Sequence, residues 1–288
     1  MSVCAFVNIN KPQNMTSSDV VVVVRGIMRR VTGEKHKVGH MGTLDPMATG
    51  VLPIAIGKST RLFNLLSEKK KTYIAEFIFG KTTDTLDAWG KVTDSDDKVV
   101  SQEDIEMVLP PLIGMIDQIP PTYSAKSIDG KRAYEYARKG IEIEIPAKKV
   151  AIYSIKILGG ANNAFKFEIT CGAGTYIRSI ARDIAKSLGT FGYMNSLVRI
   201  QSGQFEIENS VDIKEFEKDP EQYLISMEDA LSSFPFFEIP LNYSKEVLNG
   251  IKLPFDNMPE SPFVATLDNK VVGVAENISG KLTLVLRL

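Results

Sequence analysis

The backbone of this chain is most tightly constrained in residues 39–61, which read GHMGTLDPMATGVLPIAIGKSTR. Glycines permit backbone angles that other residues rarely adopt, and this segment contains four of them, Gly39, Gly42, Gly50 and Gly57. Pro46 pushes the preceding residue, Asp45, out of the helical region into an extended conformation. We therefore predict that the segment forms one rigid loop that presents the carboxylate of Asp45. The alternative interpretation is an ordinary Asp-Pro turn without a function.

The composition is that of an ordinary globular protein. The chain has 288 residues, of which 44% are hydrophobic and 24% are charged, and this length suffices for a catalytic core with a small second domain. Its longest apolar runs, such as VVVVV at 20–24, are far too short to span a bilayer, and no signal peptide is visible. Cys4 and Cys171 lie far apart and form neither a disulfide framework nor a zinc-binding spacing. We expect a cytoplasmic protein with reduced thiols and no membrane partner.

The net charge of −1 hides an uneven distribution along the chain. Residues 11–72 contain eleven Lys and Arg against four Asp and Glu, whereas residues 203–288 contain seven against fifteen. A basic N-terminal third can bind phosphates even in a protein that is acidic overall. The distribution therefore predicts a nucleic-acid partner, and a solvated surface with uneven charge is the alternative.

Residues 17–31 are predicted to form a helix although they contain five consecutive valines, which favour strands. Their apolar residues recur at the spacing of one helical face. Thr16 and Asp19 form a capping signal, and Gly33 ends the run. This helix would place several basic residues just ahead of the Asp45 loop.

Other elements follow from the same patterns. We predict strands at 71–79, 150–158 and 164–171, and helices at 101–109, 131–139 and 175–188. The last helix is amphipathic, and its periodicity places Arg178, Arg182 and Lys186 opposite the buried side. After about residue 203 the composition becomes acidic and proline-punctuated, and the final residues alternate as short strands. We therefore predict a catalytic domain over 1–231 and a small β domain over 232–288.

The catalytic chemistry is narrowed by elimination. The GKS at 57–59 lacks the earlier glycine of a phosphate-binding P-loop, because that position is Leu52. His36 and His40 have no third metal ligand nearby, and no serine or cysteine nucleophile motif is present. A carboxylate remains as the catalytic group, and carboxylates can attack an anomeric carbon. A glycosidase would need a second carboxylate, and none flanks Asp45 in the sequence. A rearrangement in which the leaving base attacks the sugar again needs only one carboxylate.

Residues 39–61 resemble the nucleophile motif of the bacterial tRNA pseudouridine-55 synthase family (the TruB type), which reads roughly GHxGxLDPxAxGxLPxxxGxxT. Four other segments are similar to motifs of the same family: 8–21, 71–90, 119–143 and 174–189. The resemblance implies an α+β fold, namely a pseudouridine synthase catalytic domain with a mixed, largely antiparallel sheet, followed by a small PUA-like β domain. It also implies isomerisation of a T-arm uridine of tRNA to pseudouridine, by an enzyme that is a monomer and needs no cofactor, metal or protein partner.

The resemblance assigns roles to individual residues. Asp45 matches the catalytic aspartate, which either attacks C1′ or removes a proton from the ribose. Tyr73 matches the tyrosine that stacks on the base and can act as a general base, and Arg178 matches the arginine that pairs with the aspartate. Residues similar to the family's substrate-binding residues are His40, Tyr176 and Leu197. Plausible phosphate contacts are Lys11, Lys37, Lys58, Arg61, Lys126 and Lys131.

Two other functions remain open at this point. One is a catalytically idle RNA-binding protein or RNA chaperone on the same scaffold, which an intact set of Asp45, Tyr73 and Arg178 disfavours. The other is a carboxylate glycosidase, which the missing second acid disfavours. The C-terminal segment is also short and acidic for an RNA-binding domain.

Overall fold

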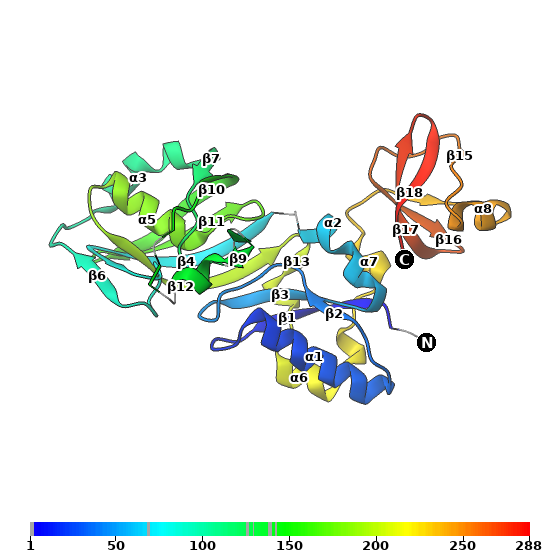
Figure 1. Ribbon diagram of the computed structural model, residues 1–288, viewed down its shortest axis with the longest axis horizontal. Helices are drawn as coiled ribbons and strands as arrows, with labels where there is room; N and C mark the ends of the chain where they lie inside the picture. Colours follow the sequence, from blue (N-terminus) through cyan, green and yellow to red (C-terminus); the bar gives the residue numbers. More distant parts are fainter. Residues whose placement is uncertain (1–2, 68–69, 125–126, 129, 138–139, 142) are drawn as a thin grey trace.

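The computed structural model describes residues 3–67, 70–124, 127–128, 130–137, 140–141 and 143–288. A large sheet with its helices makes up most of the molecule, and a small sheet at the C-terminal end of the chain lies to one side of it (Figure 1). None of the helices in these described ranges is long and apolar enough to cross a membrane.

The large sheet has nine strands in the order β1-β3-β12-β4-β11-β10-β7, with β2 beside β3 and β13 beside β12. The strands are β1 Ala5–Lys11, β2 Val38–His40, β3 Thr49–Ile56, β4 Lys71–Phe79, β7 Gly114–Gln118, β10 Lys148–Ala161, β11 Ala164–Cys171, β12 Gly192–Ser202 and β13 Phe205–Glu206. Every pairing is antiparallel except that of β3 with β12, which is parallel. The prediction of a mixed, largely antiparallel sheet is confirmed.

Two helices, α1 (Ser17–Thr32) and α5 (Ile177–Ser187), pack on one face of this sheet. Their apolar residues share one core with the residues of β4 that point to that face, which are Tyr73, Ala75, Phe77 and Phe79. The helix predicted around the valines is confirmed, with its capping box at Thr16 and Asp19 and a left-handed Gly33 at its end. Burial of the apolar helix face therefore outweighs the strand preference of valine.

The single loop expected over 39–61 is wrong. Only residues 41–48 form a loop; β2 precedes it and the buried strand β3 follows it, and a 3₁₀ helix then begins at Gly57. Gly50 is needed for a close approach of strands, since a Cβ on it would lie 2.2 Å from the carbonyl oxygen of Arg199 on β12. The glycines therefore serve strand packing as well as the loop.

The remaining predicted elements are confirmed with shifted ends. The hairpin of β10 and β11 turns at Asn162 and Asn163, which both have positive φ. The helix predicted over 131–139 begins only at Ala133, and residues 138–139 lie outside the described residues. Short helices are α2 Phe63–Ser67, α3 Gln102–Val108, α4 Ala133–Ala137, α6 Ile213–Lys218, α7 Met227–Ala230 and α8 Ser244–Leu248. Two small hairpins pair β5 Lys81–Thr83 with β6 Val92–Ser95, and β8 Ser127–Ile128 with β9 Lys131–Arg132.

The C-terminal part forms a five-stranded sheet in the order β14-β16-β17-β18-β15. Its strands are β14 Phe236–Glu238, β15 Leu253–Pro254, β16 Phe263–Leu267, β17 Lys270–Ile278 and β18 Lys281–Arg287. It has a small core of its own, and a second apolar cluster joins it to the large sheet through residues such as Phe6, Leu231 and Val264. The expected small C-terminal β domain is therefore present, while the boundary near residue 232 stays a prediction.

Candidate active site

The loop between β2 and β3 is held in place on both sides of Asp45. On one side, the Leu44 N–H donates to Ser17 Oγ of α1 at 2.8 Å. The Ser17 hydroxyl in turn donates to the Leu44 carbonyl oxygen at 3.1 Å. On the other side, the Pro46 carbonyl accepts from the Asn14 N–H at 2.9 Å. Because both neighbours of Asp45 are tied to α1 or to the segment before it, the carboxylate has a fixed position.

Arg178 grips this carboxylate with two nitrogens. Its Nε lies 2.9 Å from Asp45 Oδ2, and its Nη2 donates to Oδ1 at 3.0 Å. Of the three remaining guanidinium hydrogens, two are donated to the carbonyls of Thr85 (3.0 Å) and Tyr123 (3.1 Å). The arginine side chain is 6% exposed and that of Asp45 is 33% exposed. The buried guanidinium therefore holds the Asp45 carboxylate in place, while the exposed third of the Asp45 side chain stays open to a ligand.

The helical periodicity misplaced Arg178. It was predicted on the side of α5 away from the core, together with Arg182 and Lys186, but it is buried. Arg182 instead is partly exposed and pairs with Asp183 at 2.8 Å. The reason is that Arg178 lies in the first turn of α5, where carboxylates and carbonyls from other segments satisfy its charge and its donors.

Asp87 is a second carboxylate at this site, and the sequence analysis did not single it out. Its Oδ2 lies 3.4 Å from Arg178 Nη1, and its side chain is 10% exposed. Thr85 Oγ1 (2.7 Å) and the Trp89 N–H (3.1 Å) both donate to its Oδ1. Its only sequence signal is its position in the segment 71–90 that carries the family resemblance. The expectation that Asp45 has no carboxylate neighbour is therefore wrong in space, although true of the sequence.

The charge of Asp45 is set by opposing influences. Burial raises the pKa of the Asp45 carboxyl above its ordinary value, the Arg178 charge lowers it, and the nearby Asp87 charge raises it again. Arg178 is therefore the group that most strongly favours the ionised form of Asp45, and Asp87 opposes its effect.

Tyr73 and Leu197 lie on the neighbouring strands β4 and β12 and are both buried. Burial raises the pKa of the Tyr73 hydroxyl, which the charge of Arg199 opposes. The Asp45 charge also acts on this hydroxyl, so the two groups share one electrostatic environment. The structure thus brings Tyr73 near the Asp45–Arg178 pair.

Tyr176 and His40 are two further residues to which the resemblance assigns substrate binding. Tyr176 immediately precedes α5, and Gln118 fixes its backbone by accepting from its N–H at 2.8 Å and donating to its carbonyl at 3.2 Å. Burial raises the pKa of the Tyr176 hydroxyl. His40 ends β2, and burial lowers its pKa, so it is neutral at pH 7. Among the described residues, no contact joins His40 to Asp45.

The candidate phosphate contacts differ in their placement. Lys11 is fully buried, and its Nζ donates to the carbonyls of Pro12 (2.8 Å) and Met15 (2.7 Å), so its assignment as a phosphate contact is wrong in this conformation. Lys37 and Lys58 are exposed, as predicted for such contacts.

The other three predicted phosphate contacts are Arg61, Lys126 and Lys131. Arg61 is exposed, but its Nη1 donates to the Arg287 carbonyl of β18 at 2.7 Å. Lys126 lies outside the described residues, and for Lys131 only the backbone, in β9, is described. Part of the basic surface is also paired within the molecule, because Arg30 of α1 forms an ion pair with Glu217 of α6.

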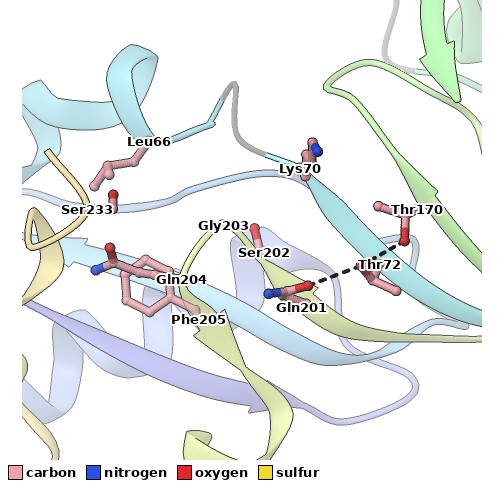
Figure 2. Close-up of a pocket in the computed structure, with 10 residues that line it drawn as sticks. All are labelled: Leu66, Lys70, Thr72, Thr170, Gln201, Ser202, Gly203, Gln204, Phe205 and Ser233. Carbon is pink, nitrogen blue, oxygen red and sulfur yellow. Dashed lines mark hydrogen bonds between the residues drawn. The ribbon is translucent and has the colours of Figure 1, made fainter. Parts of the chain in front are cut away.

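Two cavities in the described part of the protein do not include Asp45 in their lining. One of about 520 Å³ is lined by Thr72, Thr170, Gln201 and Phe205, with Lys70 at its edge (Figure 2). Thr72 precedes Tyr73 on β4, so it points to the opposite face of the sheet. Among the described residues, no group of three or more His, Cys, Asp and Glu side chains could hold a metal ion.

The chain is similar to known proteins over most of its length. Residues 29–177 match the sequence profile of the "TruB family pseudouridylate synthase (N terminal domain)". It is 38% identical over 273 residues to "tRNA pseudouridine synthase B" of Bacillus cytotoxicus, which covers 90% of this chain and 87% of the relative. It is 39% identical over 277 residues to the protein of the same name from Clostridium kluyveri, covering 94% of each chain.

Two solved structures share its fold. A chain of an H/ACA RNP bound to a substrate RNA containing 2′-deoxyuridine aligns with a TM-score of 0.72 and 21% identity, covering 98% of this chain and 84% of that chain. A chain of a Cbf5-Nop10-Gar1 complex gives a TM-score of 0.72 with 22% identity, covering 99% and 84%. These likenesses extend over the C-terminal sheet as well as the large one.

Proposed function

This chain belongs to the TruB family of pseudouridylate synthases, and we propose that Asp45, Arg178 and Tyr73 carry out the family's reaction in it. It is an isomerase, a tRNA pseudouridine synthase, and the product of this kind of enzyme is pseudouridine at position 55. The expected fold and family are confirmed.

The observation that carries the assignment is the two-point grip of Arg178 on a carboxylate that is still one-third exposed. A carboxylate that is held ionised and open to a ligand can act on the sugar while the N1–C1′ bond of uridine breaks. The released uracil then turns, and its C5 bonds to C1′. Asp45 either attacks C1′ itself or removes a proton from the ribose, and both routes need the same ionised group.

Tyr73, Leu197 and Tyr176 form the apolar side of the proposed pocket. A nucleotide inside a folded RNA loop must be extruded before its C1′ can be reached, and stacking on apolar and aromatic side chains stabilises the extruded state. The buried ring of Tyr73 and the half-buried ring of Tyr176 suit this task, and His40 at the end of β2 suits contact with the loop that the nucleotide leaves.

The decisive assay is tritium release from a tRNA transcript that contains C5-labelled uridine. Formation of the C5–C1′ bond expels the hydrogen at C5, whereas binding or hydrolysis of the glycosidic bond leaves it in place. Release at position 55, with pseudouridine as product, supports the proposal. Free uracil as product would instead support a glycosidase.

The alternatives are weaker for structural reasons. An idle RNA-binding scaffold would not need an ionised aspartate in a two-point grip beside a buried tyrosine. Asp87 could supply the second acid of a glycosidase, but it lies against Arg178 and accepts two further hydrogen bonds. Both oxygens of Asp87 are therefore already engaged by groups of the protein itself, which leaves neither of them free to protonate a leaving base.

We infer that the substrate element is the T-arm stem-loop of tRNA. We further infer that the chain acts as a monomer without an obligate protein partner in the cytoplasm. The exposed Lys37 and Lys58 then lie at the RNA backbone.

Binding of tRNA should weaken steeply with salt although the protein is acidic overall. If the basic N-terminal third neutralises several phosphates, log K should fall with log salt at a slope of about −0.7 to −0.9 per phosphate. Filter binding or fluorescence titration between low and moderate salt measures the slope. Lys37→Gln and Lys58→Gln should each reduce it, and an affinity that does not change with salt would contradict the role of the basic surface.

Activity should survive exhaustive treatment with EDTA. The two histidines and the two distant cysteines offer no metal-ligating spacing, and a carboxylate can perform this glycosyl chemistry when the pocket stabilises the charge. Because tRNA folding itself uses magnesium, the substrate should be a minimal T-arm hairpin that folds in monovalent salt. Loss of activity on that hairpin, with recovery on adding zinc, would overturn the cofactor-free mechanism.

A further inference from the structure

Arg199, on β12, is a buried cation that the proposed mechanism has not yet used. It is 0% exposed and forms no ion pair with any residue that the structure describes. Its Nε donates to the Val51 carbonyl at 2.7 Å and its Nη2 to the Gly42 carbonyl at 3.1 Å, whereas Nη1 has no partner in the described chain. Burying a charge without a counter-charge costs free energy, and a role in function accounts for such a cost.

The surroundings of Arg199 are positively charged. Burial and then the Arg199 charge lower the pKa of Lys71 to about 8. The pKa of Lys11 is also lowered to about 8, chiefly by burial, with Arg199 contributing. The nearby carboxylate of Asp45 already forms an ion pair with Arg178. Arg199 therefore lies among other buried cations.

The group that Arg199 faces is the hydroxyl of Tyr73. Arg199 is the cross-strand partner of Tyr73 between β12 and β4, and both side chains lie on the face that carries Asp45. The guanidinium acts on the phenol oxygen in the direction that favours its ionised form. Arg199 Nη1 also lies against Gly42, where a Cβ would approach it to 3.6 Å, so the cation reaches the catalytic loop as well.

We propose that Arg199 is a positioning residue that stabilises the Tyr73 oxygen as a phenolate between two proton transfers. The proposal rests on the proposed function. Once C5 has bonded to C1′, the ring must gain a proton at N1 and lose one from C5. The Tyr73 phenol gives its proton to N1 and becomes a phenolate, and this phenolate then takes the proton from C5 and becomes a phenol again. The protons balance, and the negative charge exists only beside Arg199.

A double-mutant cycle tests the link between the two residues. Arg199→Gln should lower the single-turnover rate, measured with enzyme in excess, by about ten- to a hundredfold, while the Kd for the hairpin changes little. In a Tyr73→Phe background the same substitution should change the rate by less than about twofold, because the charge that Arg199 stabilises no longer forms. Arg199→Lys, which keeps a charge, should recover part of the loss.

A second readout separates this role from a structural one. C5-deuterated uridine in the hairpin should show a larger isotope effect on the rate in Arg199→Gln than in wild type, because proton removal from C5 becomes slower. If Arg199→Gln does not fold, the same cycle and isotope measurement are made with Arg199→Lys. Equal losses with Tyr73 intact and in the Tyr73→Phe background, or an unchanged isotope effect, would overturn the proposal. Tritium release by wild type tests the proposed function separately.

Discussion

Replacement of Asp45 by asparagine is expected to abolish turnover while the protein still binds tRNA. The amide keeps the shape of the carboxylate but can neither attack C1′ nor accept a proton from the ribose. Loss of such a group lowers the rate of comparable enzymes by about 10⁴-fold or more, and we expect an effect of that size in single-turnover tritium release. The Kd for the T-arm hairpin should stay within about threefold of wild type, because phosphate contacts lie elsewhere.

The matched control is Asp97→Asn, the same chemical change at an exposed aspartate. It should leave both the rate and the affinity unchanged. A rate for Asp45→Asn within about tenfold of wild type would remove Asp45 from its proposed role, whichever of its two mechanisms applies.

Local features of the fold could be predicted well because they depend on neighbouring residues. The periodicity of α1 and the caps at Thr16 and Gly33 both act within a few residues of each other. The strand β3 could not be predicted in this way. It is buried on both sides, so its residues do not alternate, and Gly50 and Pro53 make it resemble a loop.

The candidate site depends on contacts between distant segments, which periodicity does not report. Arg178 lies 133 positions from Asp45 and was assigned to the solvent side of α5 by its spacing alone. Only the family resemblance pointed to the pair. Asp87 was missed because a single aspartate in a turn has no distinguishing pattern, and its role arises only where it meets Arg178.

The distribution of charge along the sequence indicated an RNA partner, but it did not identify which basic residues can contact the RNA. Lys11 belongs to the basic N-terminal third, yet its ammonium group is used inside the protein to hold the backbone at Pro12 and Met15. Arg199 has no distinguishing sequence pattern, and it is a buried cation in the fold. Burial depends on the tertiary fold, so a count of basic residues overestimates those that can reach RNA.

The second large effect is expected for Arg178→Lys, which retains the charge. Lysine has no planar fork and cannot hold both oxygens of Asp45 while it also donates to the carbonyls of Thr85 and Tyr123. Loss of a preorganised contact of this kind typically lowers the rate by about 10²- to 10³-fold, and we expect a loss in that range with little change in the Kd for RNA.

The pH dependence gives this prediction a second measurement. Burial already raises the pKa of Asp45, and Arg178 opposes that rise. When the opposing contact weakens, the pKa rises further, so Asp45 becomes protonated at a higher pH. Because only the ionised form is active, the acid limb of the pH–rate profile should move to higher pH in Arg178→Lys, and activity should recover in part as the pH is raised.

The control is Arg182→Lys, one turn further along α5, where the arginine is partly exposed and pairs with its neighbour Asp183. That variant should keep the wild-type rate and acid limb, because its guanidinium does not touch Asp45. If Arg178→Lys, like Arg182→Lys, kept the wild-type rate and acid limb, the contact of Arg178 with both Asp45 oxygens would stabilise the fold without contributing to catalysis. In that case Asp45 would have to be kept ionised by other charges, and Lys11 is the described cation that also lowers its pKa.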